Sequence, residues 1–355
     1  MKLLRFMNLP VYALDLSDSS YKYLTLEHHG DEMILGDYGE GALAPGIIHD
    51  GELQQPEALE AILCDIFAKK KVQFVALSLP DEKGYVRPLA LPAENVKEDE
   101  IGGALALQLE DYVPLPPSEV LFEYSLLGKK DDHYDIVLRA FPRASVTTYL
   151  ESVEKSGAVP VLVEPELAAV MRAIVPRDFD KEGMLIDWGR GRASFAFFRR
   201  GIVHFTVTVP IAGHSLADAI KQKLNVSIEA AIRFKEQEAT LSQPREGRAA
   251  ELFEAIDPVV KSLTNEITRY LQYWQSHSEE KRPPERIYLT GGEVHLHGLV
   301  EYLTAITNIE VVIADPWVNV SFPQQYVPQI PWKESLRFVS NIGLLLRAAD
   351  ENMYL

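Results

Sequence analysis

Two aspartates, Asp15 and Asp187, stand at the ends of two apolar segments that resemble each other. Residues 11–26 and 183–198 each read as an apolar strand that ends in the aspartate, a short turn, and a second strand. Another turn and a third strand follow in each case. A duplicated meander with one carboxylate per copy is suited to hold a phosphate and its metal ion between two related lobes.

The turn after Asp15 consists of small polar residues, whose backbone N–H groups and hydroxyls can surround an anion. A lysine seven residues after this aspartate would add positive charge to a bound phosphate. The candidate phosphate-binding residues are Ser17, Asp18, Ser19, Ser20 and Lys22. For this segment alone, the alternative interpretation is a hairpin turn with solvated side chains.

The corresponding turn of the second copy is rich in glycine and arginine. Gly189 and Gly191 permit close approach of the backbone to a ligand, and Arg190 and Arg192 could contact phosphate. A glycine-rich hairpin without a ligand is again the alternative interpretation.

A third segment, a strand that ends at Thr290, is followed by Gly291, Gly292 and a helix. Two glycines at such a position let a flat base or a phosphate approach the backbone and the helix N-terminus. A Gly-Gly pair alone is a weak signal, but the combination of all three turns in one chain is more specific. We therefore predict that the three turns meet in one cleft between two lobes.

Strands alternate with helices along the chain, which predicts an α/β fold. Apolar runs bounded by turn residues predict strands at 74–79 and 287–290, and apolar residues at helical spacing predict helices at 56–70 and 249–275. The predicted organisation is a first lobe at 1–93, an inserted α+β unit at 94–163, a hinge helix at 164–179, and a second lobe at 180–355 with a final helix at 338–349.

Bulk composition excludes several classes of protein. At 355 residues the chain is long for one compact domain, which agrees with two lobes. A net charge of −17 leaves no surplus of cations for nucleic acid, and the single Cys64 excludes an internal disulfide. No stretch approaches the roughly 20 apolar residues of a membrane-spanning helix. We expect a soluble cytoplasmic protein with no nucleic-acid partner and no direct membrane insertion.

Together these segments resemble the actin-like ATPase superfamily and, within it, the PilM family of type IV pilus assembly proteins. The two phosphate motifs of the superfamily correspond to residues 13–22 and 187–189, its Gly-Gly-x-x-Leu segment to 212–216, and its adenosine motif to 290–299. The inserted unit, including residues 108–116, is similar to the extra subdomain shared by PilM and the cell-division protein FtsA. The resemblance implies a ribonuclease H-like, two-lobed actin-like fold with an inserted subdomain.

The resemblance also implies roles for individual residues. Asp15 and Asp187 would hold Mg²⁺ through water, and Glu164 at the hinge is the further candidate for a catalytic acid. The implied nucleotide-binding residues are Ser17, Asp18, Ser19, Ser20, Lys22, Gly189, Gly191, Gly213, Lys235, Gly291 and Gly292. ATP with Mg²⁺ is the cofactor that such a site would bind.

Several positions depart from the family pattern. Ser17 replaces a glycine of the phosphate loop, and Asp18 adds a negative charge where a triphosphate would lie. Ile232 replaces the glutamate of the ribose-binding pattern, so that only Lys235 of that pattern remains, and Glu293 replaces a small residue beside the base. Together these changes predict a weakened or vestigial ATP site, in which binding stays open and rapid hydrolysis is not expected.

The function implied by the resemblance is that of a cytoplasmic scaffold beneath the inner membrane. Members of the PilM family bind the cytoplasmic N-terminal peptide of the membrane protein PilN, and we expect a peptide groove between the first lobe and the inserted unit. Other subunits of the pilus machine, and a ring or other homo-oligomer, are further expected partners. The scaffold would be peripheral to the inner membrane through these proteins.

Two alternatives belong to other functional classes. A small-molecule kinase of the same superfamily would need an acid facing the γ-phosphate, and Glu164 is the hinge residue available. A filament-forming protein similar to FtsA would normally end in an amphipathic membrane helix, which the neutral to acidic stretch 344–355 does not resemble.

Overall fold

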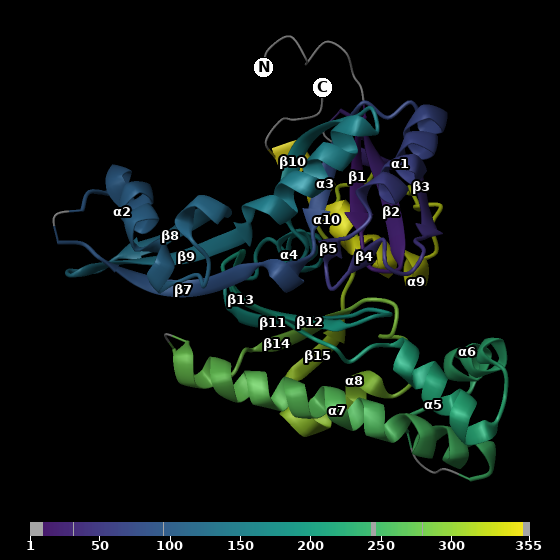
Figure 1. The fold of residues 1–355 in the computed structure, drawn as a ribbon. Helices are drawn as coiled ribbons and strands as arrows, with labels where there is room; N and C mark the ends of the chain where they lie inside the picture. Colours follow the sequence, from purple (N-terminus) through teal and green to yellow (C-terminus); the bar gives the residue numbers. More distant parts are fainter. Residues whose placement is uncertain (1–9, 31, 95, 243–245, 279, 351–355) are drawn as a thin grey trace.

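Two five-stranded sheets, one in each lobe, form the centre of the structure (Figure 1). The computed structural model describes residues 10–30, 32–94, 96–242, 246–278 and 280–350. In spatial order, the first sheet consists of β10 (Val159–Pro165), β6 (Phe74–Leu79), β1 (Val11–Leu16), β2 (Ser20–His29) and β3 (Glu32–Ala42). The second consists of β13 (Ile202–Val209), β12 (Ala193–Arg199), β11 (Glu182–Trp188), β14 (Arg286–Thr290) and β15 (Glu310–Ile313).

The two sheets have the same topology. In each, three antiparallel strands form a meander, and two parallel strands follow on the other side of the first strand. The register places Asp15 opposite Lys22 in the β1–β2 hairpin, and Asp187 beside Thr290 in the parallel pair of β11 and β14. The predicted α/β duplication, with one aspartate at the end of the first strand of each copy, is confirmed.

Helices cover both faces of the first sheet. The first-lobe helices are α1 (Pro56–Lys70), α3 (Arg143–Lys155), α4 (Glu166–Ile174) and α10 (Val339–Asp350). Because side chains alternate along a strand, Leu14 of β1 packs in the cluster of α1 and α3, whereas Ala13 packs in the cluster of α4 and α10. The helix α4 lies within the segment 164–179 that was predicted as a hinge helix.

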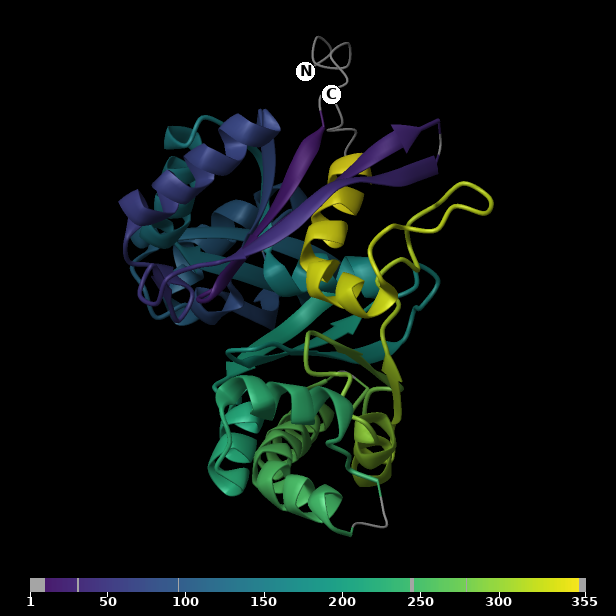
Figure 2. The ribbon, with the colours of Figure 1, turned by 90° about the vertical axis from the view of Figure 1, so that its right-hand side faces the viewer.

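The last helix, α10, belongs to the first lobe, whereas the sequence analysis assigned residues 338–349 to the second. The Asn341 side chain donates hydrogen bonds to the Ala13 carbonyl at 3.0 Å and the Lys22 carbonyl at 3.2 Å. Gly343 lies directly against the Ala169 backbone of α4. Figure 2 shows α10, in yellow, beside the purple strands of the first sheet. Helical periodicity predicted this element, but periodicity does not identify the sheet against which a helix packs.

The inserted unit projects sideways from the first lobe (Figure 1). It consists of a sheet in the order β7 (Tyr85–Pro92), β9 (His133–Pro142) and β8 (Val120–Lys129), covered by α2 (Ile101–Gln108). Its boundaries differ from the expected 94–163. The strand β7 pairs with β9 and so belongs to the unit, whereas β10 pairs with β6 and α3 packs beside α1, which places both in the first lobe.

The second lobe carries its long helices below its sheet in the view of Figure 1. These helices are α5 (His214–Leu224), α6 (Ile228–Gln237), α7 (Arg248–His277) and α8 (Leu299–Thr307). The remaining short elements are β4 (Ile48–His49), β5 (Glu52–Leu53), α9 (Trp332–Ser335) and the 3-10 helices η2 (Asp81–Lys83), η3 (Glu98–Glu100), η4 (Leu109–Asp111), η5 (Pro117–Glu119) and η6 (Leu336–Phe338). None of the helices in the described ranges combines the length and the apolar character needed to cross a membrane.

The contact of α10 with α4 should be sensitive to a single methyl group. A Cβ at Gly343 would lie 1.8 Å from the Ala169 carbonyl oxygen, so Gly343→Ala should lower the free energy of unfolding by about 1–3 kcal/mol. Gly103 in α2 has no neighbour within 4 Å of such a Cβ, so Gly103→Ala should be neutral or stabilise by about 0.5–1 kcal/mol. Urea unfolding of both variants measures the difference, and equal stability of the two would contradict this packing.

Candidate functional site

The three turns singled out in the sequence lie together where the lobes meet. Arg192, in the β11–β12 turn, lies 3.8 Å from Asp18 in the β1–β2 turn. Gly291 follows β14 with a φ of +96°, and a Cβ there would lie 2.4 Å from the Asp187 carboxylate. A residue without a side chain is therefore required at this position. We call this region the lobe junction; its charged members are Asp15, Asp18, Lys22, Asp81, Glu82, Glu166, Asp187 and Arg192.

Asp15 is buried and hydrogen-bonded on both carboxylate oxygens. Lys22 Nζ lies 2.7 Å from Oδ2, and the Ser78 hydroxyl donates to Oδ1 at 2.9 Å. Burial alone would raise the pKa of Asp15, but the Lys22 ammonium and the Ser78 hydrogen bond hold the pKa below its ordinary value. Asp15 is therefore a carboxylate that already has a cation partner within its own hairpin.

Burial raises the pKa of two other acids of the lobe junction. Burial raises the pKa of Asp187 to about 6, with Lys22 and Arg192 opposing the shift. Burial also raises the pKa of Glu166 well above its ordinary value, and the neighbouring Asp15 carboxylate adds to this effect. The lobe junction thus holds more carboxyl groups than cations, and the raised pKa values reflect the cost of burying these charges together.

Arg192 connects the second lobe to three acids of the first. Its Nη1 lies 2.5 Å from Glu82 Oε1 and 3.8 Å from Asp18 Oδ1, and its Nη2 donates to Glu166 Oε2 at 3.3 Å. The three acids come from η2, the β1–β2 turn and the first turn of α4. Since the guanidinium group is planar and has five donors, it can hold several carboxylates at once. Arg192 is the residue through which the β11–β12 turn is tied to the first lobe.

A second charged pair occupies the side where the adenosine motif was expected. Lys235 Nζ lies 2.6 Å from Glu293 Oε2, and the Glu293 side chain is buried. Glu293 lies directly over Gly213, because a Cβ at this glycine would come within 2.1 Å of Glu293 Cγ. Lys235, which was expected to bind the ribose, is thus paired with Glu293. The Glu293 side chain in turn covers Gly213, which was expected to face the nucleotide.

The glycines of the second-lobe turns have different surroundings. The Gly189 amide donates to the Arg192 carbonyl at 2.9 Å, which closes the β11–β12 turn, and the Gly213 amide donates to the Gly189 carbonyl at 3.0 Å. Open space lies beside Gly191 and Gly292, where an added Cβ would meet no atom within 4 Å. Backbone contacts therefore explain Gly189 and Gly213 without a ligand, whereas Gly191 and Gly292 leave room near the junction.

The serine turn forms hydrogen bonds within itself and with the residue that follows β3. The Ser17 amide donates to the Ser20 carbonyl at 2.9 Å, and the hydroxyls of the two serines lie 3.0 Å apart. The Ser19 carbonyl accepts a hydrogen bond from the Leu43 amide at 2.9 Å. The Ser17 amide and the Ser17 and Ser20 hydroxyls, which were expected to surround a phosphate, are thus used within the turn.

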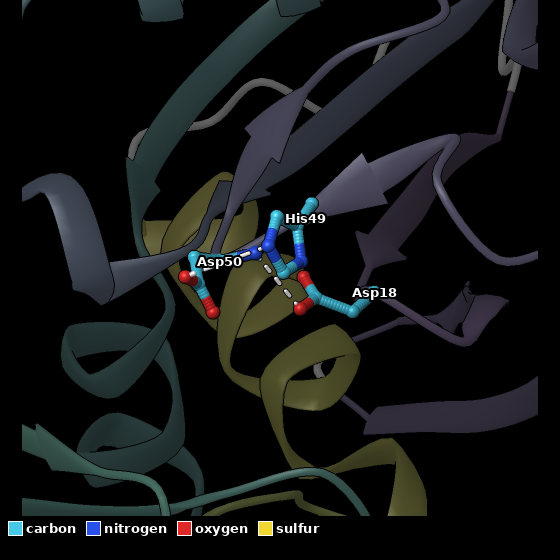
Figure 3. A group of neighbouring side chains, drawn as sticks. All are labelled: Asp18, His49 and Asp50. Carbon is cyan, nitrogen blue, oxygen red and sulfur yellow. Dashed lines mark hydrogen bonds and ion pairs between the residues drawn. The ribbon is translucent and has the colours of Figure 1, made fainter.

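Asp18 braces the turn between β4 and β5 (Figure 3). Its two carboxylate oxygens accept hydrogen bonds from the Asp50 and Gly51 amides at 2.9 and 3.1 Å. Asp18, His49 and Asp50 each bring one ligand atom within 4.8 Å of the others, but His49 and Asp50 are exposed. Because exposed acidic groups commonly lie together without an ion, we interpret this cluster as a brace for the turn.

Glu164, the acid expected at the hinge, is bound by two arginines. Arg172 forms a two-point ion pair with its carboxylate, and Arg347 Nη1 lies 2.9 Å from Oε2. The acid that faces the lobe junction is Glu166, two residues later, which the sequence analysis did not select. The available signal was its place in the first turn of a helix, where acids are favoured.

Asp81 is the other acid that the sequence analysis missed. It is buried after β6, and its Oδ2 accepts a hydrogen bond from the Leu167 amide in the first turn of α4 at 2.7 Å. Its Oδ1 has no hydrogen-bond partner among the described residues. Burial raises the pKa of Asp81 to about 7, although the Leu167 hydrogen bond opposes the shift.

The duplicated sheets, the paired hairpin acids and the inserted unit define a two-lobed protein of the actin-like class. The family model described as Type IV pilus assembly protein PilM matches residues 13–349. The chain therefore belongs to the PilM family of type IV pilus assembly proteins, as the sequence motifs predicted.

Solved structures of similar fold agree with this class. The PilM–PilN type IV pilus biogenesis complex contains a chain with a TM-score of 0.78 and 22% identity, over 95% of this chain and 98% of that one. MreB5 of Spiroplasma citri bound to ADP has a TM-score of 0.58 and 12% identity, over 98% and 97%. The ethanolamine utilization protein EutJ from Carboxydothermus hydrogenoformans has a TM-score of 0.55 and 14% identity, over 95% and 89%. These likenesses confirm the actin-like fold.

The raised pKa of Asp81 should make stability depend on pH. Because the folded state binds this proton more tightly than the unfolded state, the free energy of unfolding should fall as pH rises from about 4 to about 7. Asp81→Asn keeps an acceptor for Leu167 but cannot ionise. The advantage of this variant over the unaltered protein should grow by on the order of 2 kcal/mol between pH 5 and pH 8. Urea unfolding at the two pH values tests this, and a difference that stays constant would refute the assignment.

Proposed function

We propose that this chain is a cytoplasmic scaffold of a type IV pilus, or related secretion, assembly machine. It binds the cytoplasmic N-terminal peptide of an inner-membrane partner similar to PilN, and its ATP site is degenerate. The family match over residues 13–349 and the likeness to the PilM–PilN complex support the scaffold role. Through such a partner the protein is held at the cytoplasmic face of the inner membrane.

The degenerate site is inferred from one observation: the cations in and beside the lobe junction are already paired with carboxylates. Lys22 is paired with Asp15, Lys235 with Glu293, and Arg192 with three carboxylates. In an active nucleotide site, cations of this kind are available to the phosphates. Here a triphosphate would have to break existing ion pairs and leave partly buried carboxylates without partners, which is costly.

Mg²⁺ with ATP also fits the donor set poorly. Asp15 and Asp187 are oxygen donors suited to Mg²⁺, but Asp15 is already bound to Lys22 and Ser78. The carboxylate of Asp18 stands in the turn that would approach the phosphates. On the adenosine side, Glu293 covers Gly213. We therefore assign the junction a structural role in holding the lobes together.

The kinase alternative would need Glu164 as its catalytic acid. Glu164 is held by Arg172 and Arg347, and its side chain is almost fully buried. A general base must reach the proton that it abstracts, so an acid in this arrangement is poorly placed for phosphoryl transfer. Glu166 does face the junction, but it is engaged by Arg192.

Peptide binding should depend on the exposed face of the inserted unit. Leu107 of α2 is 90% exposed to solvent. Burial of such a large apolar side chain against a partner is favourable, and we propose that Leu107 is an anchor for the partner peptide. Leu107→Glu should weaken binding of a PilN-like cytoplasmic peptide by about tenfold or more. Lys333→Glu, at an exposed position of α9 outside the inserted unit, is the control and should have little effect although its charge change is larger.

Fluorescence anisotropy with the labelled N-terminal tail of each membrane protein encoded nearby measures this binding. If no such tail binds the unaltered protein, the scaffold proposal is wrong. If a tail binds with equal affinity to both variants, the scaffold role stands but Leu107 is not its anchor.

Calorimetric titration tests the degenerate site. ATP with Mg²⁺ should give no saturable binding below about 1 mM for the unaltered protein. Glu293→Ala removes an acid and uncovers Gly213, so this variant should bind ATP more tightly than the unaltered protein. Micromolar binding by the unaltered protein that is lost in Lys22→Ala, with both proteins folded, would show instead that the site is functional.

A further inference from the structure

A large groove lies between the inserted unit and the second lobe, away from the lobe junction. Its volume is about 1050 Å³, at the upper end of the range for small-molecule pockets. One wall is the strand β7 with the end of β8, and the other is β13 with the last turns of α7. In Figure 1, β7 is the strand of the inserted unit that faces α7.

Two strand edges line this groove. In the described sheets, β7 is hydrogen-bonded to β9 and β13 to β12, so each strand is the edge of its own sheet. Pro88, which has no amide hydrogen, lies in β7, where an edge position tolerates it. Strand edges present backbone donors and acceptors at regular spacing, which suits an extended peptide segment better than a compact small molecule.

The groove is cationic although the protein carries a net charge of −17. Five of its lining side chains are basic and two are acidic; the basic ones are Arg87, Lys129, Lys130, Arg199 and Arg200. Lys130 is paired with one of the two acids, Asp135, at 3.0 Å. The other acid, Glu182, is buried and accepts a hydrogen bond from Trp274. Arg199 is also paired, with Glu280 outside the groove lining at 2.9 Å.

The other three basic residues carry charge that no carboxylate among the described residues of the groove balances. Arg87 is exposed and donates to the Tyr112 carbonyl, which is neutral. Lys129 lies over the Tyr134 ring, and Arg200 is exposed at the β12–β13 turn. On a surface that repels anions elsewhere, this local excess attracts an acidic partner.

Aromatic side chains line the second-lobe wall. Tyr273 of α7 is 42% exposed, and it stacks on His277 with ring centroids 4.1 Å apart. The ring of Phe205 in β13 also lies near Tyr273, with the two centroids 5.0 Å apart. A rigid, partly exposed aromatic group of this kind is typical of the residues that contribute most to binding interfaces.

We propose that this groove is a docking site for an extended acidic segment of a partner protein, with an aromatic or aliphatic residue that packs on Tyr273. Its carboxylates would be bound by Arg87, Lys129 and Arg200. This site differs in position and in chemistry from the peptide site of the proposed function, and it does not depend on that proposal.

A synthetic probe tests the docking site without knowledge of the natural partner. The probe is a fluorescein-labelled peptide in which glutamate alternates with phenylalanine, and lysine replaces glutamate in the control peptide. The acidic peptide should bind to the full chain, and the basic one should not. Reversal of charge by Arg87→Glu together with Arg200→Glu should weaken binding at least about tenfold, and Tyr273→Ala should also weaken it. Arg87→Glu alone should also weaken binding, whereas Lys333→Glu, which makes the same charge change as that single variant but outside the groove, should alter affinity less than about twofold.

Hydrogen exchange with the bound probe locates the site. Protection should appear in β7 and β13, and binding should weaken as salt rises. Failure of the acidic peptide to bind, equal binding of the basic peptide, or equal loss in Lys333→Glu would overturn the proposal. Displacement of the probe by single-stranded oligonucleotide, or by a second copy of this chain, would reassign the groove to that occupant.

Discussion

The central constraint at the lobe junction is the need to neutralise carboxylates that two lobes bring together out of water, beside the apolar core that the two sheets share. Each lobe contributes an aspartate at the end of its first strand, and the first lobe adds Glu82 and Glu166. Burial makes unpaired charges costly, so a cation must lie between these groups or protons must be retained. Arg192 from the second lobe supplies that cation, and in doing so it ties the two lobes together.

The same constraint underlies the structural role that we propose for the lobe junction. In the actin-like fold the two hairpins are positioned by duplicated sheets, and that geometry persists here. The side chains at the junction are paired with each other instead of facing an open cleft, as Lys22 with Asp15 and Lys235 with Glu293 illustrate. With the lobes held in this way, the surfaces around the inserted unit have a fixed relation to both lobes. The scaffold role that we propose would benefit from such rigidity.

Local patterns in the sequence were sufficient for most elements and for the meeting of the three turns. The apolar run of β6 and the helical spacing of α1 matched the structure because turn residues bound both segments. Partners in space were harder to predict: α10 and β10 were placed in the wrong units because periodicity does not specify the neighbouring sheet. Glu164 and Glu166 lie two residues apart, and the start of α4 between them decides which one reaches the junction. Arg192 was noted as a phosphate ligand, but its pairing with acids distant in the chain had no local signal.

The central claim is that internal ion pairs hold the lobes together without nucleotide, and an inter-lobe distance measures this directly. Cys64 on α1 is exposed, and Glu236→Cys would place a second spin label on α6 of the other lobe. Electron–electron double resonance should give one narrow distance distribution that ATP with Mg²⁺ leaves unchanged, and Arg192→Gln should broaden it. A distribution that is already broad in the unaltered protein and becomes narrower and shorter on addition of ATP with Mg²⁺ would contradict the account.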